Sequence, residues 1–384
     1  MKKIFTLLIL LFAFAGCTDD AYREPVESTR QSRDSIAAAS ARTLDEYLRT
    51  NTSPAAATQL EEDVTFRITD DGTIMFNVLH MMSEEHTMHQ GLLLFKEEVE
   101  TRTNGAITVE VLANSPGDAT LIELVNSNQA DAAVVTILGA WGTINELANF
   151  ESLPFVFSSY EEAWAAYEGE LGDWVTQNVI VPSGAMALAY WTNGLRHFTN
   201  NVRPILVPED MAGLIMRSPQ APTHLAMYEA FGAASMSMPF GQLREALADG
   251  RAEGQDNPIG QIHTGRLFEV QDYMSMSYHM YSTMPFIVSV ELWNSLTEEQ
   301  QQILVEAGRL AGRYQGELAV ELETRQLEEI LASGTQVVTV DTAPFANAVE
   351  HIWIDHIERF GNDFVTLASR YISDTNSLAH RFAG

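Results

Sequence analysis

The sequence predicts an α/β protein made of one large domain or two ordinary ones. Residues 213–258 alternate short apolar segments with helical patterns, in the order strand, helix, strand, helix. The chain has 384 residues and an apolar content of 46%, which is enough for packed cores of this size. A third observation is one unusually long helical pattern, over residues 297–333.

The first sixteen residues have the pattern of a bacterial signal peptide. Lys2 and Lys3 precede an apolar run over residues 4–14, which is too short to span a membrane. Residues 14–17, Phe-Ala-Gly-Cys, resemble a lipobox, with Phe where Leu is commoner. We therefore predict cleavage before Cys17 and lipidation of this residue. The alternative is a plain signal peptide followed by an incidental cysteine.

Residues 17–63 are polar and predict a tether between the lipid and the folded protein. Within them, residues 35–48 have a partial helical pattern, because Ile36, Leu44 and Leu48 are nearly in phase. Cys17 is the only cysteine of the chain, so no disulfide within one chain and no zinc site built from several cysteines is expected.

The net charge of –30 argues against nucleic acid as a partner, because the phosphate backbone would be repelled. The chain after residue 16 contains one lysine, Lys96, which disfavours lysine-based covalent catalysis. We find no P-loop, no G-x-G-x-x-G and no G-x-S-x-G, and nothing orders serine, histidine and aspartate into a triad. His86 and His89 form an H-x-x-H, which we interpret as a helix start. No metal site and no cofactor are expected.

The first half of the folded region alternates strands and helices. Strands are expected at residues 64–68, 74–79, 107–112, 130–138 and 185–191, with a hairpin turn at 70–72. Helices are expected at residues 88–103, 120–128, 160–169 and 172–178. The strand over 185–191 is apolar enough to cross between two lobes. Residues 153–157, Leu-Pro-Phe-Val-Phe, are interpreted as a buried loop.

The second half continues the alternation. Strands are expected at residues 214–216, 273–277, 285–289 and 336–340, and a short apolar segment ends at 238–240. Helices are expected near 225–231 and at 242–248, 262–268, 297–333, 344–360 and 363–371, and residues 254–258 are interpreted as a polar turn. Thr297 and Gln300 form a capping box. Gly308, Gly312 and Gly316 predict a bend, or a straight helix that tolerates them.

Three runs in the second half, in order and with ordinary spacing, resemble the solute-binding proteins of TRAP transporters, the DctP family. They are G-x-x-x-R-x-P at 213–219, M-P-F-x-x-x-x-x-A-L at 238–247 and G-Q-x-N-P at 254–258. G-x-R-x-x-x-N at 194–200 and T-x-G-x-I-x-V-E-V at 103–111 add to it, although Ala106 stands where a basic residue is common. The resemblance extends from about residue 74 to about residue 371.

The resemblance implies a two-lobed periplasmic binding protein with a hinge cleft and a long helix along both lobes. The chain would cross between lobes near residues 193 and 282. We predict lobe I from residues 64–193 and 283–322, and lobe II from residues 194–282 and 323–384.

The resemblance also implies the ligand-binding residues. Arg217 would form a bidentate hydrogen bond to a carboxylate. From the pattern alone a surface arginine paired with an acid would be the commoner outcome. Arg196 would add positive charge, Asn257 would donate its amide, and the aromatic Phe240 would stack on or wall the ligand.

Four further residues are weaker candidates for the same cleft. Two are histidines, His279 and His80, for which the alternative is a buried histidine with satisfied hydrogen bonds; we prefer that alternative for His80. Trp191 and Trp141 lie near strand ends and could wall the cleft, with core packing as the alternative.

The function that follows is capture of a small organic acid and its delivery to a TRAP membrane permease. The expected location is the periplasm of a Gram-negative bacterium, on a lipid anchor. Two alternatives stay open: a sensory lipoprotein that presents its ligand-bound form to a receptor, and an enzyme acting on an organic acid. The lack of an assembled catalytic motif counts against the enzyme.

Overall fold

The computed structural model describes residues 66–115 and 117–383. Its centre is a mixed sheet with the strand order β1-β2-β4-β10-β5-β8-β6-β7; β3 pairs with β2, β9 with β5, and β11 with β9. The strands are β1 (Arg67–Ile68), β2 (Ile74–Leu79), β3 (Ile107–Leu112), β4 (Ala132–Val134), β5 (Ala185–Asn200), β6 (Ile215–Ser218), β7 (Ala234–Ser237), β8 (Gly254–Pro258), β9 (Tyr273–Met276), β10 (Tyr281–Ser289) and β11 (Gln336–Thr339).

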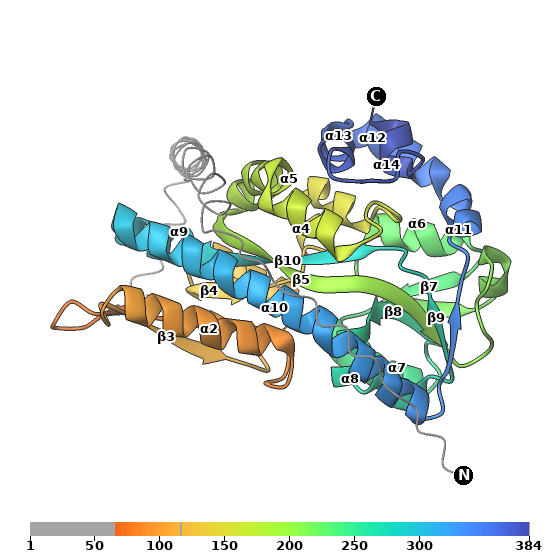
Figure 1. Ribbon diagram of the computed structural model, residues 1–384, viewed down its shortest axis with the longest axis horizontal. Coiled ribbons are helices and arrows are strands. Elements are labelled where there is room, and N and C mark those ends of the chain that lie inside the picture. Colours follow the sequence, from red (N-terminus) through yellow and green to blue (C-terminus); the bar gives the residue numbers. More distant parts are fainter. Residues whose placement is uncertain (1–65, 116, 384) are drawn as a thin grey trace, which may run out of the picture.

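Strand β5 joins two parts of this sheet. Its first residues, up to Leu195, pair antiparallel with β10. Its last residues, from Arg196 to Asn200, pair antiparallel with β8 and in part with β9. A register shift in β10 lies between Ser282 and Thr283, close to this change of partners. Figure 1 shows β5 running through the middle of the molecule between the two groups of strands.

Helices cover the sheet on both faces (Figure 1). In the first half they are α2 (Thr87–Arg102), α3 (Asp118–Asn126), α4 (Tyr160–Glu168) and α5 (Glu170–Val175), and in the second α6 (Pro222–Ala230), α7 (Leu243–Ala248), α8 (Ile259–Thr264), α9 (Val290–Ser295), α10 (Glu298–Ala332), α11 (Ala343–Ala348), α12 (Glu350–Phe360), α13 (Asp363–Ser369) and α14 (Leu378–Phe382). The alternation predicted from the sequence is confirmed.

Helix α10 is the longest element, and its ends agree with the sequence. Thr297 accepts a hydrogen bond from the backbone of Gln300, whose side chain in turn accepts one from the backbone of Thr297, so the capping box is confirmed. The helix runs unbroken past its glycines. A Cβ on Gly312 would come within 2.5 Å of the Trp191 ring. The glycine therefore lets the helix approach β5 closely, and α2 packs on the same helix.

The C-terminal helices pack back onto the first half of the chain. Phe364 of α13 stacks on Phe150, with the ring centroids 4.3 Å apart. The indole Nε1 of Trp353 donates to the carbonyl of Pro154 at 3.0 Å. Residues 343–383 thus contact a segment that the predicted division gives to lobe I, and Phe345 also packs against Phe198 at the other end of β5. The residue boundaries of the two lobes stay a prediction.

Several elements differ from the expectation. Strand β5 is longer than predicted and takes in residues 192–200, and β4 is shorter. The segment 344–360 breaks at Val349 into two helices. The largest error concerns residues 254–258, which form the buried strand β8 and not a turn. Polar side chains are tolerated there because neighbouring strands supply hydrogen-bond partners, which a local pattern does not reveal.

The predicted signal peptide, the lipidated Cys17, the tether and the helix over residues 35–48 lie outside the described residues. In the part of the chain that is described, no helix combines the length and apolarity needed to cross a membrane.

Candidate functional site

Arg217 is a buried arginine near the end of β6, with an exposed fraction of 4%. Its Nε and Nη2 both donate to the carbonyl of Met238, at 3.0 and 2.7 Å. Among the described residues no carboxylate lies within ion-pair distance of this guanidinium. Burial, together with the nearby charge of Arg196, lowers the pKa of Arg217 to about 10, so the side chain stays charged at neutral pH.

Arg196 differs from Arg217 because it has its own carboxylate. Its Nε donates to Asp256 Oδ2 at 2.6 Å, and its Nη2 donates to the backbone carbonyl of Asp256. Both side chains are buried. β5 and β8 pair antiparallel, with Arg196 opposite Pro258 and Phe198 opposite Asp256, so Arg196 and Asp256 are diagonal neighbours on the same face of the sheet. This ion pair neutralises the charge of Arg196, whereas Arg217 forms no ion pair with a carboxylate of the described residues.

Asp256 is the centre of a buried polar cluster that the sequence analysis did not find. Its Oδ1 contacts His224 Nε2 at 2.8 Å and accepts from the Tyr228 hydroxyl at 2.5 Å. Burial raises the pKa of the Asp256 carboxyl, but Arg196 and His224 outweigh it and hold the pKa well below its ordinary value. His224 and Tyr228 lie one turn apart on α6. From the sequence alone this spacing indicates ordinary core packing, because it does not show that Asp256 of β8 lies opposite.

His279 joins the same cluster from the segment between β9 and β10. Its Nε2 lies 3.2 Å from Asp256 Oδ2, its Nδ1 lies 2.7 Å from Ser277 Oγ, and its ring stacks on Phe198 at a centroid distance of 4.0 Å. Burial lowers the pKa of His279 to about 4, so the ring is neutral at pH 7. Both ring nitrogens of His279 thus have partners, as in the buried histidine that the sequence analysis gave as the alternative.

Asn257 and His197 face each other across β8 and β5. Asn257 Nδ2 donates to Gln255 Oε1 at 2.5 Å. His197 Nδ1 accepts from the backbone of Tyr278 at 3.3 Å, while its buried Nε2 has no partner among the described residues. Burial lowers the pKa of His197 to about 3. The ring is therefore neutral, and Nε2 is the nitrogen that carries the hydrogen. The sequence analysis did not single out His197.

The other predicted site residues lie apart from this cluster. Phe240 follows Met238 and Pro239 at the start of a 3₁₀ turn and is half-buried. The two tryptophans are buried: Trp141 Nε1 donates to Ser183 Oγ, and Trp191 Nε1 donates to the carbonyl of Gly308, both at 2.9 Å. These are the contacts of packing residues, the alternative weighed from the sequence.

The histidines of the first half form a pair and a cap. His80 Nε2 lies 3.0 Å from His89 Nδ1, and burial, with a contribution from His89, lowers the pKa of His80 to about 3. His86 caps α2 by accepting from the backbone of Met88 at 3.1 Å, which confirms the helix start. Within the described ranges no group of three or more potential ligand residues is arranged to hold a metal ion.

The loops of the two halves touch beside Arg217. Gly139, in the loop after β4, has a positive φ of 91°. A Cβ placed on it would lie 2.9 Å from the Cβ of Pro219, two residues beyond Arg217. The loops that follow the carboxyl ends of β4 and β6 therefore touch, and such loops are where open α/β sheets bind their ligands. Chemically, this part of the protein supplies a buried guanidinium, that of Arg217, which can form charge-assisted hydrogen bonds to an anion.

Comparisons with known proteins show which family this chain resembles. The family described as bacterial extracellular solute-binding protein, family 7 (DctP), matches residues 78–359. The 2,3-diketo-L-gulonate-binding periplasmic protein YiaO of Escherichia coli K12 is 28% identical over 270 residues, which are 70% of this chain and 82% of that protein. The C4-dicarboxylate-binding periplasmic protein DctP of Rhodobacter capsulatus is 26% identical and covers 76% of this chain and 89% of its own.

Solved structures show the same fold. A TRAP periplasmic solute-binding protein of Polaromonas sp. JS666, bound to D-erythronate, is 28% identical with a TM-score of 0.73, and covers 77% of this chain and 98% of its own. A second one, from Sulfitobacter sp. NAS-14.1 with bound β-D-galacturonate, is 26% identical with a TM-score of 0.73, over 77% and 99% of the two chains. The two-lobed α/β fold with a long helix, predicted from the sequence, is confirmed.

Proposed function

Because this chain belongs to the bacterial extracellular solute-binding proteins of family 7, we propose that it captures a small organic acid between its lobes and delivers it to a TRAP-type membrane permease. Relatives of known structure hold D-erythronate and β-D-galacturonate, which are both carboxylates. The proposal is binding and release without turnover. It includes closure of the lobes about crossings near residues 193 and 282, and anchoring of the protein in the periplasm through lipid on Cys17.

One observation carries the proposal: Arg217 is a buried charge with which no carboxylate of the described residues pairs. A buried guanidinium without a counter-ion costs several kcal/mol in an ordinary core, so such residues are rare unless something neutralises them. Arg196 has Asp256, whereas among the described residues Arg217 has only the carbonyl of Met238. A carboxylate bound from solution would supply the missing charge and accept the remaining N–H groups.

The other predicted site residues take graded roles in this proposal. Asn257 and Phe240 flank the strand ends next to Arg217 and orient the acid. Arg196 and His279 act indirectly, since Asp256 occupies them. His80 is fully buried against His89 and would act only as support from the first half, as Trp141 and Trp191 would from the core.

The test is a thermal-shift and calorimetry screen of mono- and dicarboxylates, keto acids, sugar acids and aromatic acids. A binder at 100 times its Kd should stabilise the protein by ~2.7 kcal/mol. We expect Arg217→Met to weaken binding of that acid by ~2–5 kcal/mol, roughly 30-fold to several thousand-fold. Recovering the acid unchanged after incubation tests the absence of turnover.

Arg203 is a matched control, because it is partly exposed and donates to the backbone carbonyls of Asp210 and Ala212 away from the strand ends. Arg203→Met should leave acid affinity unchanged. Equal stabilisation of wild type and Arg217→Met by the same acids would refute the carboxylate site, and so would stabilisation by neutral compounds alone.

A further inference from the structure

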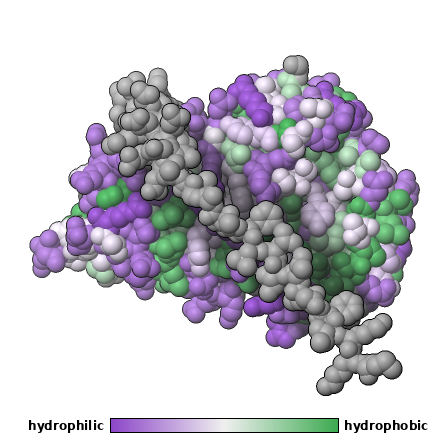
Figure 2. All heavy atoms as spheres, in the orientation of Figure 1, coloured by the Kyte–Doolittle hydropathy of each residue, from purple (hydrophilic) through white to green (hydrophobic). Residues whose placement is uncertain are grey.

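The two strands on which the lobes are predicted to hinge, β5 and β10, are held by polar side chains where they cross between the lobes. Hydrophilic side chains cover much of the visible surface (Figure 2), but the polar residues at the crossings are buried. β5 changes partners between Leu195 and Arg196, and β10 shifts register between Ser282 and Thr283. Positions of this kind, at the ends of paired segments, are where a hinge absorbs its change of backbone angles.

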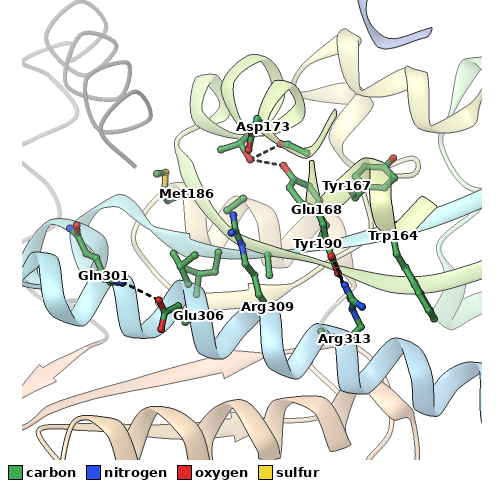
Figure 3. Close-up of a pocket in the computed structure, with 18 of the residues that line it drawn as sticks. Trp164, Tyr167, Glu168, Asp173, Met186, Tyr190, Gln301, Glu306, Arg309 and Arg313 are labelled. Carbon is green, nitrogen blue, oxygen red and sulfur yellow. Dashed lines mark hydrogen bonds and ion pairs between the residues drawn. The ribbon is translucent and has the colours of Figure 1, made fainter. Parts of the chain in front are cut away.

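One face of helix α4 contacts both crossing strands. Its residues Tyr160, Trp164 and Tyr167 follow one another at helical spacing. Tyr160 and Tyr167 both pack on the ring of Tyr281 in β10, at centroid distances of 6.1 and 6.2 Å. Figure 3 shows Trp164 pointing from α4 towards α10, and its Nε1 donates to Thr192 Oγ1 in β5 at 2.7 Å.

The crossing of β10 is held from the side of the predicted lobe I. Glu151 accepts from the backbone N–H of Thr283 at 2.5 Å and from the hydroxyl of Tyr167 at 2.6 Å. All three residues belong to the predicted lobe I. These hydrogen bonds therefore fix β10 to α4 next to the predicted boundary, but they do not span it.

The crossing of β5 is different, because Tyr160 reaches over the predicted boundary. Its hydroxyl donates to Glu323 Oε1 on α10 and accepts from the backbone N–H of Leu195 at 3.3 Å. Tyr160 belongs to the predicted lobe I, whereas Leu195 and Glu323 belong to the predicted lobe II. One buried hydroxyl thus joins lobe I to two separate elements of lobe II. These two hydrogen bonds are called the Tyr160 latch below.

The protonation of its two side chains makes the latch a strong contact. Burial, together with the charge of Glu323, raises the pKa of Tyr160 well above its ordinary value, so the hydroxyl keeps its hydrogen and is the donor. Burial raises the pKa of Glu323 to about 7, against the opposing effect of the hydrogen bond from Tyr160. Above that pH the bond is charge-assisted. A movement that separates the two side chains leaves a largely buried carboxylate without its donor, which costs free energy.

The latch lies beside the strand end that carries Asn257. Gly194, with a φ of 130°, separates the two: a Cβ placed on it would lie 2.9 Å from Pro258 Cβ and 3.2 Å from the hydroxyl oxygen of Tyr160. Pro258 follows Asn257 at the end of β8. The latch and a strand end of the predicted ligand site therefore pack against the same residue of the crossing strand.

We propose that the Tyr160 latch stabilises the closed arrangement of the lobes and thereby slows the release of a bound acid. The inference rests on the proposed function, since it requires lobes that close on a ligand. In the structure the loops of the two halves touch at Gly139 and Pro219, and the latch is formed in that same arrangement. A contact made in the closed form and lost in the open one shifts the equilibrium towards the closed form. Tyr160 is thus a positioning residue and not a ligand contact.

The experiment measures association and dissociation of the captured acid by stopped-flow fluorescence at pH 8, where Glu323 is ionised. Tyr160→Phe removes the hydroxyl, and Tyr160→Phe combined with Glu323→Leu also removes the carboxylate that the first variant leaves without a donor. We expect the dissociation rate constant to rise by roughly fivefold or more in both variants, with the association rate constant changed by less than about twofold. The double variant decides the question where Tyr160→Phe alone does not fold.

Tyr190→Phe is the matched control. It also removes a tyrosine hydroxyl from the sheet beside α4, but this hydroxyl contacts Thr176 Oγ1 at 2.8 Å, and both residues belong to the predicted lobe I. Both rate constants should stay at their wild-type values. Glu323→Gln keeps an oxygen that accepts from Tyr160, so it should speed dissociation less than either Tyr160 variant.

The outcomes separate the latch from the proposed function. An acid that binds through Arg217 and leaves the folded Tyr160 variants at the wild-type rate would overturn the latch alone. Equally fast dissociation in Tyr190→Phe would also overturn it, because general loosening of the sheet would then explain the effect. If no acid is captured in a way that depends on Arg217, the proposed function fails and the latch fails with it.

Discussion

At the scale of single residues, Arg196 and Arg217 differ in what neutralises their charge. Arg196 is tied to Asp256, which also holds His224, Tyr228 and His279, and this cluster links β5, β8 and α6. Arg217 meets only a backbone carbonyl among the described residues. The first arginine is therefore part of the folding core, while the second is the one that the proposed function assigns to a ligand carboxylate.

This contrast predicts opposite effects on the stability of the ligand-free protein. Arg196→Met leaves the Asp256 carboxylate buried without its cation, so we expect the free energy of unfolding to fall by ~3–5 kcal/mol. Arg217→Met removes an uncompensated buried charge and should change stability by less than about 1 kcal/mol, or increase it. Urea unfolding of both variants measures the difference. A loss of several kcal/mol in Arg217→Met would mean that this arginine is structural.

Glu151 gives a pH dependence of stability. Its carboxyl accepts from the Tyr167 hydroxyl and the backbone of Thr283, at 2.6 and 2.5 Å, yet burial raises its pKa from 4.5 to about 7. At a pH between these two pKa values, Glu151 of the folded protein keeps a proton that the unfolded chain has released. The free energy of unfolding should therefore fall as pH rises from about 4.5 to about 7, by roughly 3 kcal/mol from this group.

Glu151→Gln, which cannot titrate, should lack this contribution. Chemical unfolding of wild type and variant at pH 5, 6, 7 and 8 gives the free energy of unfolding of each as a function of pH. The difference between the two curves is the contribution of Glu151. The variant should gain stability relative to wild type up to pH 7 and no more above it. Parallel curves over the whole range would contradict the burial of a protonated Glu151.

At the scale of elements, the glycines of α10 show what a tertiary contact adds to a local pattern. Gly308, Gly312 and Gly316 weaken a helix by propensity alone. In the structure the helix stays continuous, and these residues lie against β5. The sequence predicted the helix and its cap correctly. It could not show that Gly312 makes room for Trp191, because the two residues are 121 positions apart.

We therefore expect different results from two alanine substitutions on this helix. A Cβ at Gly312 would lie 2.5 Å from Trp191 Cδ1, so Gly312→Ala should destabilise the protein by ~1–3 kcal/mol through overpacking. At Gly308 the nearest atom would be 3.4 Å away, so Gly308→Ala should be neutral or stabilise by up to ~1 kcal/mol. Thermal unfolding measures both effects. Equal stabilisation in the two variants would show that propensity dominates.

At the scale of the whole molecule, the contact between the loops after β4 and β6 is the feature that ligand capture would use. Gly139→Asn places a side chain against Pro219 and should keep the lobes apart. We expect affinity for the captured acid to fall at least tenfold, together with a smaller ligand-induced decrease in radius of gyration, measured by small-angle scattering.

Gly72→Asn is the control, since its φ of 86° imposes similar backbone strain but no neighbouring atom lies within 4 Å. Similar affinity losses in both variants would point to backbone strain and not to closure.

The sequence by itself determined the family, the α/β class, the capping box of α10 and the approximate span of most helices and strands. These depend on residues that are close along the chain, so that periodicity, caps and short motifs report them directly. The tertiary structure alone decided that residues 254–258 are a buried strand and that Trp141 and Trp191 pack in the core. It also decided that Asp256 neutralises Arg196, while Arg217 pairs with no carboxylate of the described residues. The physical reason is that burial and charge compensation depend on partners from distant parts of the chain. Arg196 and Asp256 are 60 positions apart and meet only because two antiparallel strands pair in one register.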